Sequence, residues 1–263
     1  MARLCSLFSG SSGNSVLISG GGAKILVDAG KNARTIENAL KRIGEDLRCI
    51  DAILVTHEHC DHTTALDVLV RRYRIPVYAN APTLKALRST LGVVDEDLLR
   101  VLPTGAAATV KDLVFTSFAV PHDSAECVGY ALETEGTRIA VFTDVGHVPD
   151  ALLARVAGSD LVFLEANHDV QLLRAGRYPW PLKQRILGPH GHLSNEDCGA
   201  AVRFLLDNGT ERFVVGHLSH ENNFPELAYQ TVVSVLEAGG AKVGVDYDLA
   251  VAPRSEPGEI HEL

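Results

Sequence analysis

Four strong metal ligands, His57, His59, Asp61 and His62, stand within six consecutive residues of this chain. Three neutral imidazoles and one carboxylate suit a borderline divalent metal such as zinc or manganese. A single histidine in a polar loop usually makes only ordinary hydrogen bonds, but this density of ligands favours a metal site. A closed structural zinc site is a poor alternative, because no cysteine pair has the spacing that such sites use.

The sequence around this cluster predicts how the ligands are positioned. An apolar run before it predicts a buried strand, and the helical spacing after it predicts an amphipathic helix. The ligands then lie on a strand-to-helix loop, where alternate side chains of an extended backbone point the same way. His57, His59 and Asp61 would share one side, and His62 would turn toward another part of the site. This geometry can serve two metals.

Three further ligand candidates each follow a predicted strand: His122, Asp144 and His217. A ligand at a strand end is held by a rigid scaffold and can still reach a cleft. A two-metal hydrolase needs one carboxylate that bridges both ions, with histidines completing each side. Asp144 is the best candidate for the bridge, with His122 completing the first site and His217 the second. His192, in a polar stretch before a predicted helix, is not explained by helix capping.

Length and composition indicate one domain. The chain has 263 residues, of which 46% are hydrophobic, enough for a sizeable core. We expect one domain over 1–252 and a mobile polar tail at 253–263. No stretch is apolar enough for a transmembrane helix, and the first residues lack a secretory signal, so no membrane partner is expected. Five scattered cysteines without a C-x-x-C pair favour reduced thiols and a cytoplasmic location.

Charge is unevenly distributed along the chain. A formal net charge of −9 argues against an obvious nucleic-acid binder. Residues 170–195, however, include no acidic side chain and combine basic with aromatic ones. The candidates in this segment for substrate binding are Arg174, Arg177, Tyr178, Trp180 and Lys183. Such a segment can hold a phosphate backbone and stack a base; a solvated basic face around a packed tryptophan is an equal alternative.

The order of predicted elements favours an α/β protein. Predicted strands cover residues 4–8, 15–18, 24–28, 50–55, 76–79, 109–110, 113–120, 129–133, 138–142, 161–164, 212–215 and 247–251. Predicted helices cover residues 35–43, 64–73, 82–91, 148–156, 197–206 and 225–237. Mixed sheets with helices outside them fit this order.

The candidate residues resemble those of a known group of enzymes. The clustered ligands match the H-x-H-x-D-H signature of the metallo-β-lactamase superfamily, and Asp28 matches its aspartate after an early strand. The strand-end candidates fall in the order expected for its remaining ligands. Other segments resemble the YycJ (WalJ) family within it, among them Asn-His-Asp at 167–169, Arg-Tyr-Pro-Trp at 177–180 and His-Leu-Ser-x-Glu-Asn-Asn at 217–223.

The resemblance implies an αββα sandwich of two mixed β-sheets flanked by helices, and a binuclear site for zinc or manganese. It also implies a 5′→3′ exonuclease whose partner is a nucleic acid, DNA. The first metal would be bound by His57, His59 and His122. The second would be bound by Asp61, His62 and His217, and Asp144 would bridge the two.

The hypothesis for the reaction is attack of a metal-bound hydroxide on the phosphorus. Asp61 would orient that hydroxide or take its proton. His192 resembles a histidine near the scissile phosphate in RNA-processing relatives and would protonate the departing oxygen. Two alternatives stay open at this point. One is a small-molecule hydrolase of thioesters, lactones or β-lactams on the same fold, and the other is a non-enzymatic, metal-dependent regulator.

Overall fold

The computed structural model describes residues 1–263 and divides the chain into two compact units. Unit 1 comprises Met1–Ala119, Ser124–Thr137 and Pro253–Leu263. Unit 2 comprises Val120–Asp123 and Arg138–Ala252. The expectation of a single domain over 1–252 stays a prediction. No helix is long and apolar enough to cross a lipid bilayer.

The strands form two seven-stranded sheets, each with parallel and antiparallel pairs. The first sheet has the order β14-β1-β2-β3-β4-β5-β6, with strands β14 (Ile260–Glu262), β1 (Arg3–Phe8), β2 (Ser15–Gly20), β3 (Ala23–Val27), β4 (Ala52–Leu54), β5 (Val77–Ala79) and β6 (Leu99–Val101). The second has the order β13-β12-β11-β10-β9-β8-β7, with strands β13 (Asp248–Val251), β12 (Arg212–Gly216), β11 (Leu161–Glu165), β10 (Thr137–Phe142), β9 (Val128–Thr134), β8 (Leu113–Ala119) and β7 (Ala107–Val110).

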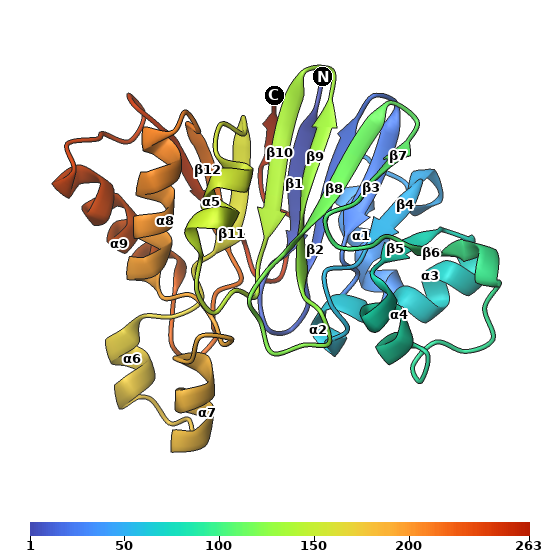
Figure 1. Cartoon of the computed structure of the whole chain (residues 1–263), viewed down its shortest axis with the longest axis horizontal. Helices are drawn as coiled ribbons and strands as arrows, with labels where there is room; N and C mark the ends of the chain where they lie inside the picture. Colours follow the sequence, from blue (N-terminus) through green and yellow to red (C-terminus); the bar gives the residue numbers. More distant parts are fainter. The chain divides into compact units, whose positions relative to one another are not determined.

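The helices lie between and after these strands in the sequence. They are α1 (Ala33–Arg42), α2 (Cys60–Thr63), α3 (Leu66–Tyr73), α4 (Ala81–Leu87), α5 (Asp150–Val156), α6 (Val170–Ala175), α7 (Trp180–Ile186), α8 (Asn195–Asp207) and α9 (Pro225–Ala238), with short 3-10 turns at Leu47–Cys49 and Glu96–Leu98. Figure 1 labels most of these elements along the chain. The predicted elements are largely found, but the sequence did not predict α2, α6, α7, β6 or β14.

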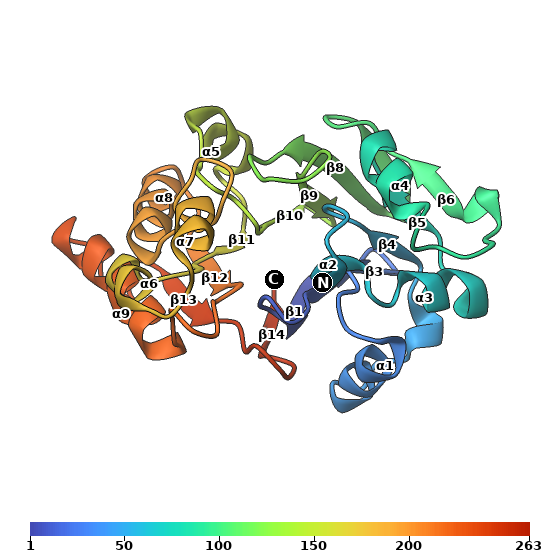
Figure 2. The ribbon, with the colours of Figure 1, turned by 90° about the horizontal axis from the view of Figure 1, so that it is seen from below.

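The core of unit 1 lies between one face of the first sheet and helices α1, α3 and α4 (Figure 2). Helix α1 buries Ile36 and Leu40 at a helical spacing, and α3 buries Leu66 and Val70 in the same way. Each such side chain stabilises the fold by about 1.5–3 kcal/mol relative to exposure. The sheet is therefore anchored on one face, and the loops at its strand ends carry the polar side chains.

The antiparallel strands β7, β8 and β9 also belong to unit 1, and Phe115 on β8 contacts Tyr78 on β5 of the first sheet. Tyr130 on β9 is fully buried, and its hydroxyl donates to the carbonyl of Val55 at 2.7 Å. The N–H of Val128 donates to the carbonyl of Thr56 at 3.0 Å. These bonds fix the backbone immediately before the histidine cluster.

The last eleven residues differ from expectation. The sequence suggested a mobile polar tail at 253–263, but this segment ends in β14, which pairs antiparallel with β1. Its register places Ile260 opposite Cys5 and Glu262 opposite Arg3. The tail thus covers an edge of the first sheet that would otherwise expose unpaired backbone groups.

The parallel strands of unit 2 are paired so that three of them end side by side. Strands β10, β11, β12 and β13 are parallel neighbours, with Phe142 opposite Leu164 and Glu165 opposite Gly216. The carboxyl ends of β10, β11 and β12 therefore lie next to one another. Helix α8 packs on α9 in this unit and buries Cys198, Val202 and Leu205.

Candidate metal centre

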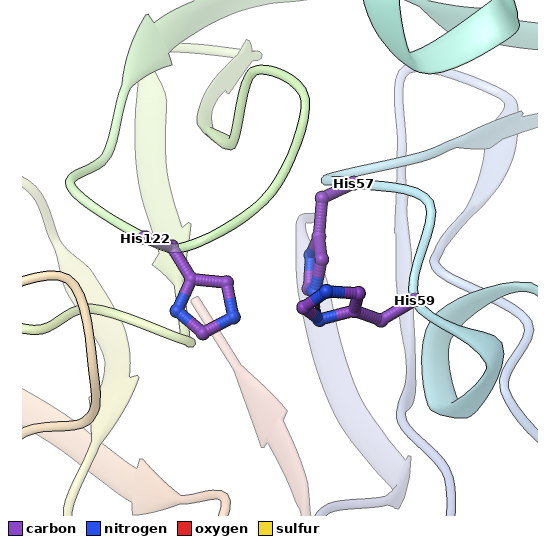
Figure 3. A group of neighbouring side chains, drawn as sticks. All are labelled: His57, His59 and His122. Atoms are coloured by element: carbon purple, nitrogen blue, oxygen red, sulfur yellow. Dashed lines mark hydrogen bonds between the residues drawn. The ribbon is translucent and has the colours of Figure 1, made fainter. Parts of the chain in front are cut away.

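The signature histidines of unit 1 gather at the end of β4. His57 is fully buried, and its Nε2 lies 3.0 Å from Nδ1 of His59. The two rings meet edge to face with centroids 4.6 Å apart (Figure 3). The ring of His62 lies on the other side of His57, with a centroid separation of 4.2 Å. The structure thus brings together the three histidines that the sequence singled out in this unit.

The second half of the H-x-H-x-D-H segment is not extended as the sequence predicted. Residues Cys60–Thr63 form the one-turn helix α2, and the N–H of His62 donates to the carbonyl of His59 at 3.0 Å. Asp61 is therefore on a helical turn and not on the extended segment that carries His57 and His59. The alternation argument holds only for those two histidines, because the backbone turns immediately after His59.

Asp28 explains how His62 is oriented. This buried carboxylate accepts hydrogen bonds from the N–H and the hydroxyl of Thr56, both at 2.8 Å. It also lies 2.7 Å from Nδ1 of His62. A carboxylate on one ring nitrogen fixes the orientation of the ring, and the opposite nitrogen, Nε2, lies 3.0 Å from Nδ2 of Asn14. The superfamily aspartate at this position thus acts as a support for a candidate ligand.

In unit 2, the residues at the ends of three neighbouring strands form a second cluster of carboxylate and histidine side chains. Asp144 follows β10, Glu165 ends β11, and His217 follows β12. Nδ1 of His217 lies 2.8 Å from Oδ2 of Asp144. Both residues have a positive φ of 55°, in the left-handed region that residues other than glycine rarely adopt. This backbone conformation turns each side chain out of the strand direction at the sheet edge.

Glu165 holds His192 in this cluster. The Glu165 side chain is fully buried, with Oε1 2.8 Å from Nδ1 of His192. Its Oε2 accepts from the backbone N–H of Val145 at 2.9 Å and of Leu193 at 3.1 Å. Burial alone would lower the pKa of His192, but the Glu165 charge and hydrogen bond, with the Asp144 charge, outweigh it and raise that pKa to about 9. The Glu165 carboxylate therefore favours the protonated form of His192.

His122 completes this group. Its Nδ1 lies 3.0 Å from the carbonyl oxygen of Gly191, the acceptor to which this nitrogen donates, and its Nε2 lies 3.8 Å from Oδ1 of Asp144. Burial lowers the pKa of His122, while the Asp144 charge opposes that shift. A neutral imidazole with one nitrogen bonded to a carbonyl is the form that binds metals.

A network of amide side chains supports His217 from behind. Asn167 donates to the carbonyl of His217 at 3.0 Å, and Asn223 donates to the carbonyls of Ala166 and Asn167 at 2.9 and 3.1 Å. Asn195 and Asn223 also bond to each other through their side chains. These contacts account for the buried amide side chains of Asn167, Asn195 and Asn223.

The donor sets fit divalent metals. The ligand atoms of Asp144, Glu165, His192 and His217 lie within 4.8 Å of one another. A tetrahedral metal with bonds of about 2.0–2.2 Å separates neighbouring ligand atoms by about 3.3–3.6 Å. The separations of 3.0 Å between His57 and His59, and of 2.8 Å between Asp144 and His217, lie just below this range. Nitrogen and oxygen donors of this kind suit divalent ions such as zinc or manganese.

Helices α6 and α7 carry the basic and aromatic segment, and they lie side by side in both views (Figures 1 and 2). Arg174 and Arg177 are exposed, Tyr178 is half-buried, and the Trp180 side chain is 62% exposed. Lys183 is buried instead, and its Nζ donates to the carbonyls of Arg174 and Gly176, both at 2.6 Å. Its amine thus joins α7 to the end of α6.

Sequence reasoning gave no role to Glu165. The sequence did mark this residue, because Glu165 stands at the end of an apolar strand, much as Asp144 and His217 follow apolar strands. What the sequence could not show was that this carboxylate meets His192, which lies 27 residues further along the chain.

Comparisons with known proteins agree with this geometry. The family model described as a β-lactamase superfamily domain matches residues 23–218. The chain is 39% identical to exodeoxyribonuclease YycJ of Bacillus anthracis over 243 residues, which are 92% of each chain. It is 42% identical to exodeoxyribonuclease WalJ of Streptococcus pneumoniae over 92% of this chain and 90% of that one.

A solved structure confirms the predicted fold. The metallo-β-lactamase fold protein YhfI from Bacillus subtilis superposes with a TM-score of 0.72 at 14% identity, covering 98% of this chain and all of that one. An identity of 14% supports the fold alone. The two exodeoxyribonucleases match 92% of this chain at 39–42% identity and therefore support the family as well. The chain therefore belongs to the metallo-β-lactamase superfamily and, within it, to the family that contains the exodeoxyribonucleases YycJ and WalJ.

Proposed function

We propose that this protein is a metal-dependent phosphodiesterase that digests DNA as a 5′→3′ exonuclease. The observation that carries this proposal is the identity of 39–42% to two exodeoxyribonucleases over 92% of the chain. The buried histidine and carboxylate clusters of both units supply the donors that hydrolytic metal sites use. A non-enzymatic regulator would have no need of a carboxylate-held proton donor.

We further propose that two divalent ions, zinc or manganese, bind to the ligand set that the signature implies. His57, His59 and His122 would hold the first ion. Asp61, His62 and His217 would hold the second, with Asp144 shared between them. When bound, such ions lower the pKa of a water molecule and neutralise charge on phosphoryl oxygens. The orientation of His62 by Asp28 and of His122 by Gly191 supports this assignment.

The protein's own residues would move the protons. The Asp61 side chain is only 22% exposed and lies 3.7 Å from Nε2 of His62, where it can orient the attacking water and accept its proton. His192, protonated because of Glu165, would donate a proton to the departing 3′ oxygen. After this transfer, Glu165 would hold the neutral ring of His192 in the same orientation through Nδ1.

The DNA strand would be bound by the segment 174–180. Exposed guanidinium groups of Arg174 and Arg177 can contact phosphates, and Tyr178 or Trp180 can stack on a base. Lys183 would contribute mainly by holding this segment in place, since its amine is bonded to two carbonyl groups.

The test is to incubate metal-stripped protein with end-labelled single- and double-stranded DNA and RNA. Manganese and zinc are added back separately, with Asp61→Ala alongside. We expect metal-dependent release of mononucleotides from the 5′ end of DNA, and loss of this activity in the variant. Glu37→Ala, which removes a carboxylate from the surface of α1, is the matched control and should digest DNA at the wild-type rate.

Three outcomes would contradict parts of the proposal. Wild-type rates in Asp61→Ala would exclude the proposed role of this carboxylate. Preferential digestion of RNA, or release from the 3′ end, would change the substrate or polarity and keep the chemistry. No degradation of any strand, with metals bound, would favour a small-molecule hydrolase on the same fold.

A further inference from the structure

The turn between β1 and β2 presents unused hydrogen-bond donors. The N–H of Gly13 donates to the carbonyl of Gly10 at 2.8 Å and closes the turn. Ser11 and Ser12 lie exposed at its tip. Their two backbone N–H groups donate to no protein acceptor. Consecutive N–H groups and hydroxyls of this kind form a concavity that suits anions.

Lys31 brings a positive charge to the same turn. Its Nζ lies 2.9 Å from Oγ of Ser12 and 5.9 Å from the centroid of the Phe8 ring. The side-chain stem crosses Gly13, where an added Cβ would lie 2.7 Å from Cδ of Lys31. Glycine at this position is therefore what allows the amine to reach the turn. No carboxylate forms an ion pair with Lys31, so its charge is not neutralised.

Helix α1 adds to the positive potential here. It begins at Ala33, two residues after Lys31, with Asn32 as its N-cap. Its first turn contains no acidic residue. The N-terminus of a ten-residue helix carries a partial positive charge that attracts anions. The amine and the helix terminus thus reinforce each other beside the serine turn.

The turn is rigidly joined to the signature loop. Asn14 accepts from the N–H of Gly10 at 2.8 Å, and its own N–H donates to the carbonyl of Asp61 at 2.8 Å. Its Nδ2 lies 3.0 Å from Nε2 of His62. Gly30 passes so close that a Cβ there would lie 1.6 Å from the carbonyl oxygen of Asp61. An anion at the turn would therefore be held at a fixed position beside the candidate catalytic loop.

We propose that Ser11, Ser12 and Lys31 form a phosphoryl-binding subsite that positions the DNA strand next to the metal ligands. This inference rests on the proposed function, because it identifies the bound group as a phosphate of the strand that is digested. The group is either the 5′-terminal phosphate or an internal phosphodiester of the same strand, and both present the oxygens that these donors recognise.

The first measurement does not depend on activity. Inorganic phosphate is titrated into the whole protein while the backbone amide signals are followed by NMR. We expect the signals of Ser11 and Ser12 to shift in the wild type and to shift much less in Lys31→Gln. Lys41→Gln is the matched control, because it removes one lysine charge from the opposite end of α1, where Lys41 pairs with Glu37. It should respond like the wild type.

The second measurement is kinetic and distinguishes the sources of the phosphate. KM is compared for strands with a 5′-phosphate and with a 5′-hydroxyl. We expect Lys31→Gln to raise KM about tenfold with little change in kcat, as for loss of one charge-assisted contact. An effect limited to 5′-phosphorylated strands identifies the terminal phosphate, and an equal effect on both identifies an internal diester.

The two proposals fail in distinguishable ways. If the wild type digests DNA and Lys31→Gln behaves like Lys41→Gln in both measurements, the subsite is wrong and the nuclease stands. If no strand is digested but phosphate still shifts the Ser11 and Ser12 signals in a Lys31-dependent manner, the anion site stands without the proposed nuclease. Absence of any phosphate-dependent shift at the turn overturns the subsite.

Discussion

His168 should make the stability of this protein depend on pH. The side chain is 1% exposed, and neither ring nitrogen has a hydrogen-bond partner. Burial lowers the pKa of His168 from 6.5 to about 4, although the nearby charge of Glu165 opposes this shift. Between these two values the unfolded chain binds a proton that the folded chain does not. Stability is therefore lost as the pH falls from 6.5 toward 4.

The size of the effect follows from the shift. One pKa unit corresponds to about 1.4 kcal/mol, so lowering the pH from 7 to 5 should cost about 2 kcal/mol through this side chain. Urea unfolding of the metal-stripped protein, followed by circular dichroism at both pH values, measures the loss. In His168→Gln, which cannot titrate, the loss should be smaller than in the wild type by about 2 kcal/mol.

A control separates this effect from the titration of other groups. His220→Gln removes a histidine whose side chain is 70% exposed, and its loss of stability should match that of the wild type. Parallel losses in the wild type and in His168→Gln would refute the argument. They would mean that the buried ring accepts a proton in the folded state without the expected penalty.

Three further predictions concern Glu165 and the residues proposed to bind the substrate. Glu165→Gln should lower kcat on end-labelled DNA by about 100-fold or more, because His192 loses the carboxylate that keeps it protonated; a rate within twofold of the wild type would contradict this. Lys183→Met should cost about 2 kcal/mol of stability in urea unfolding and leave the salt dependence of DNA binding unchanged, since its amine is buried on two carbonyls. In contrast, replacing Arg174 and Arg177 by Gln should reduce the slope of log K against log salt by about 2, and a reduced slope in Lys183→Met would place that amine on the strand instead.

The candidate ligands could be found in the sequence because each one is marked locally. His57 and His59 stand two residues apart after an apolar run, Asp144 lies two residues after the end of one apolar strand, and His217 directly follows another. Parallel strands end at the same sheet edge, and in the structure the side chains after β10 and β12 meet across the end of β11, which lies between them. These inferences need only the period of the strand and the direction of the chain.

The remaining features depend on contacts between distant segments. Lys183 resembles any exposed lysine in the sequence, and only the close approach of α6 and α7 buries it. The helical turn that contains Asp61 depends on a hydrogen bond from the N–H of His62 to the carbonyl of His59, which no propensity in this histidine-rich stretch predicts. Strand β14 has three residues within a polar tail, and it forms because β1 offers an unpaired edge.

Asp28, Asp144 and His217 share a left-handed backbone conformation with positive φ. Asp28, Asp144 and His217 each follow a strand directly or within two residues, and their φ values are 62°, 55° and 55°. Such a conformation costs about 1–3 kcal/mol for a residue other than glycine and persists only where neighbours hold it.

Those neighbours can be named. Thr56 donates to Asp28, Glu165 accepts from the N–H after Asp144, and Asn167 donates to the carbonyl of His217. Glycine would relieve the strain at all three positions but would remove a carboxylate or an imidazole. The fold therefore keeps backbone strain that glycine would relieve, and in return it keeps two carboxylates and an imidazole. Such an exchange of stability for side chains is what a site selected for chemistry should show.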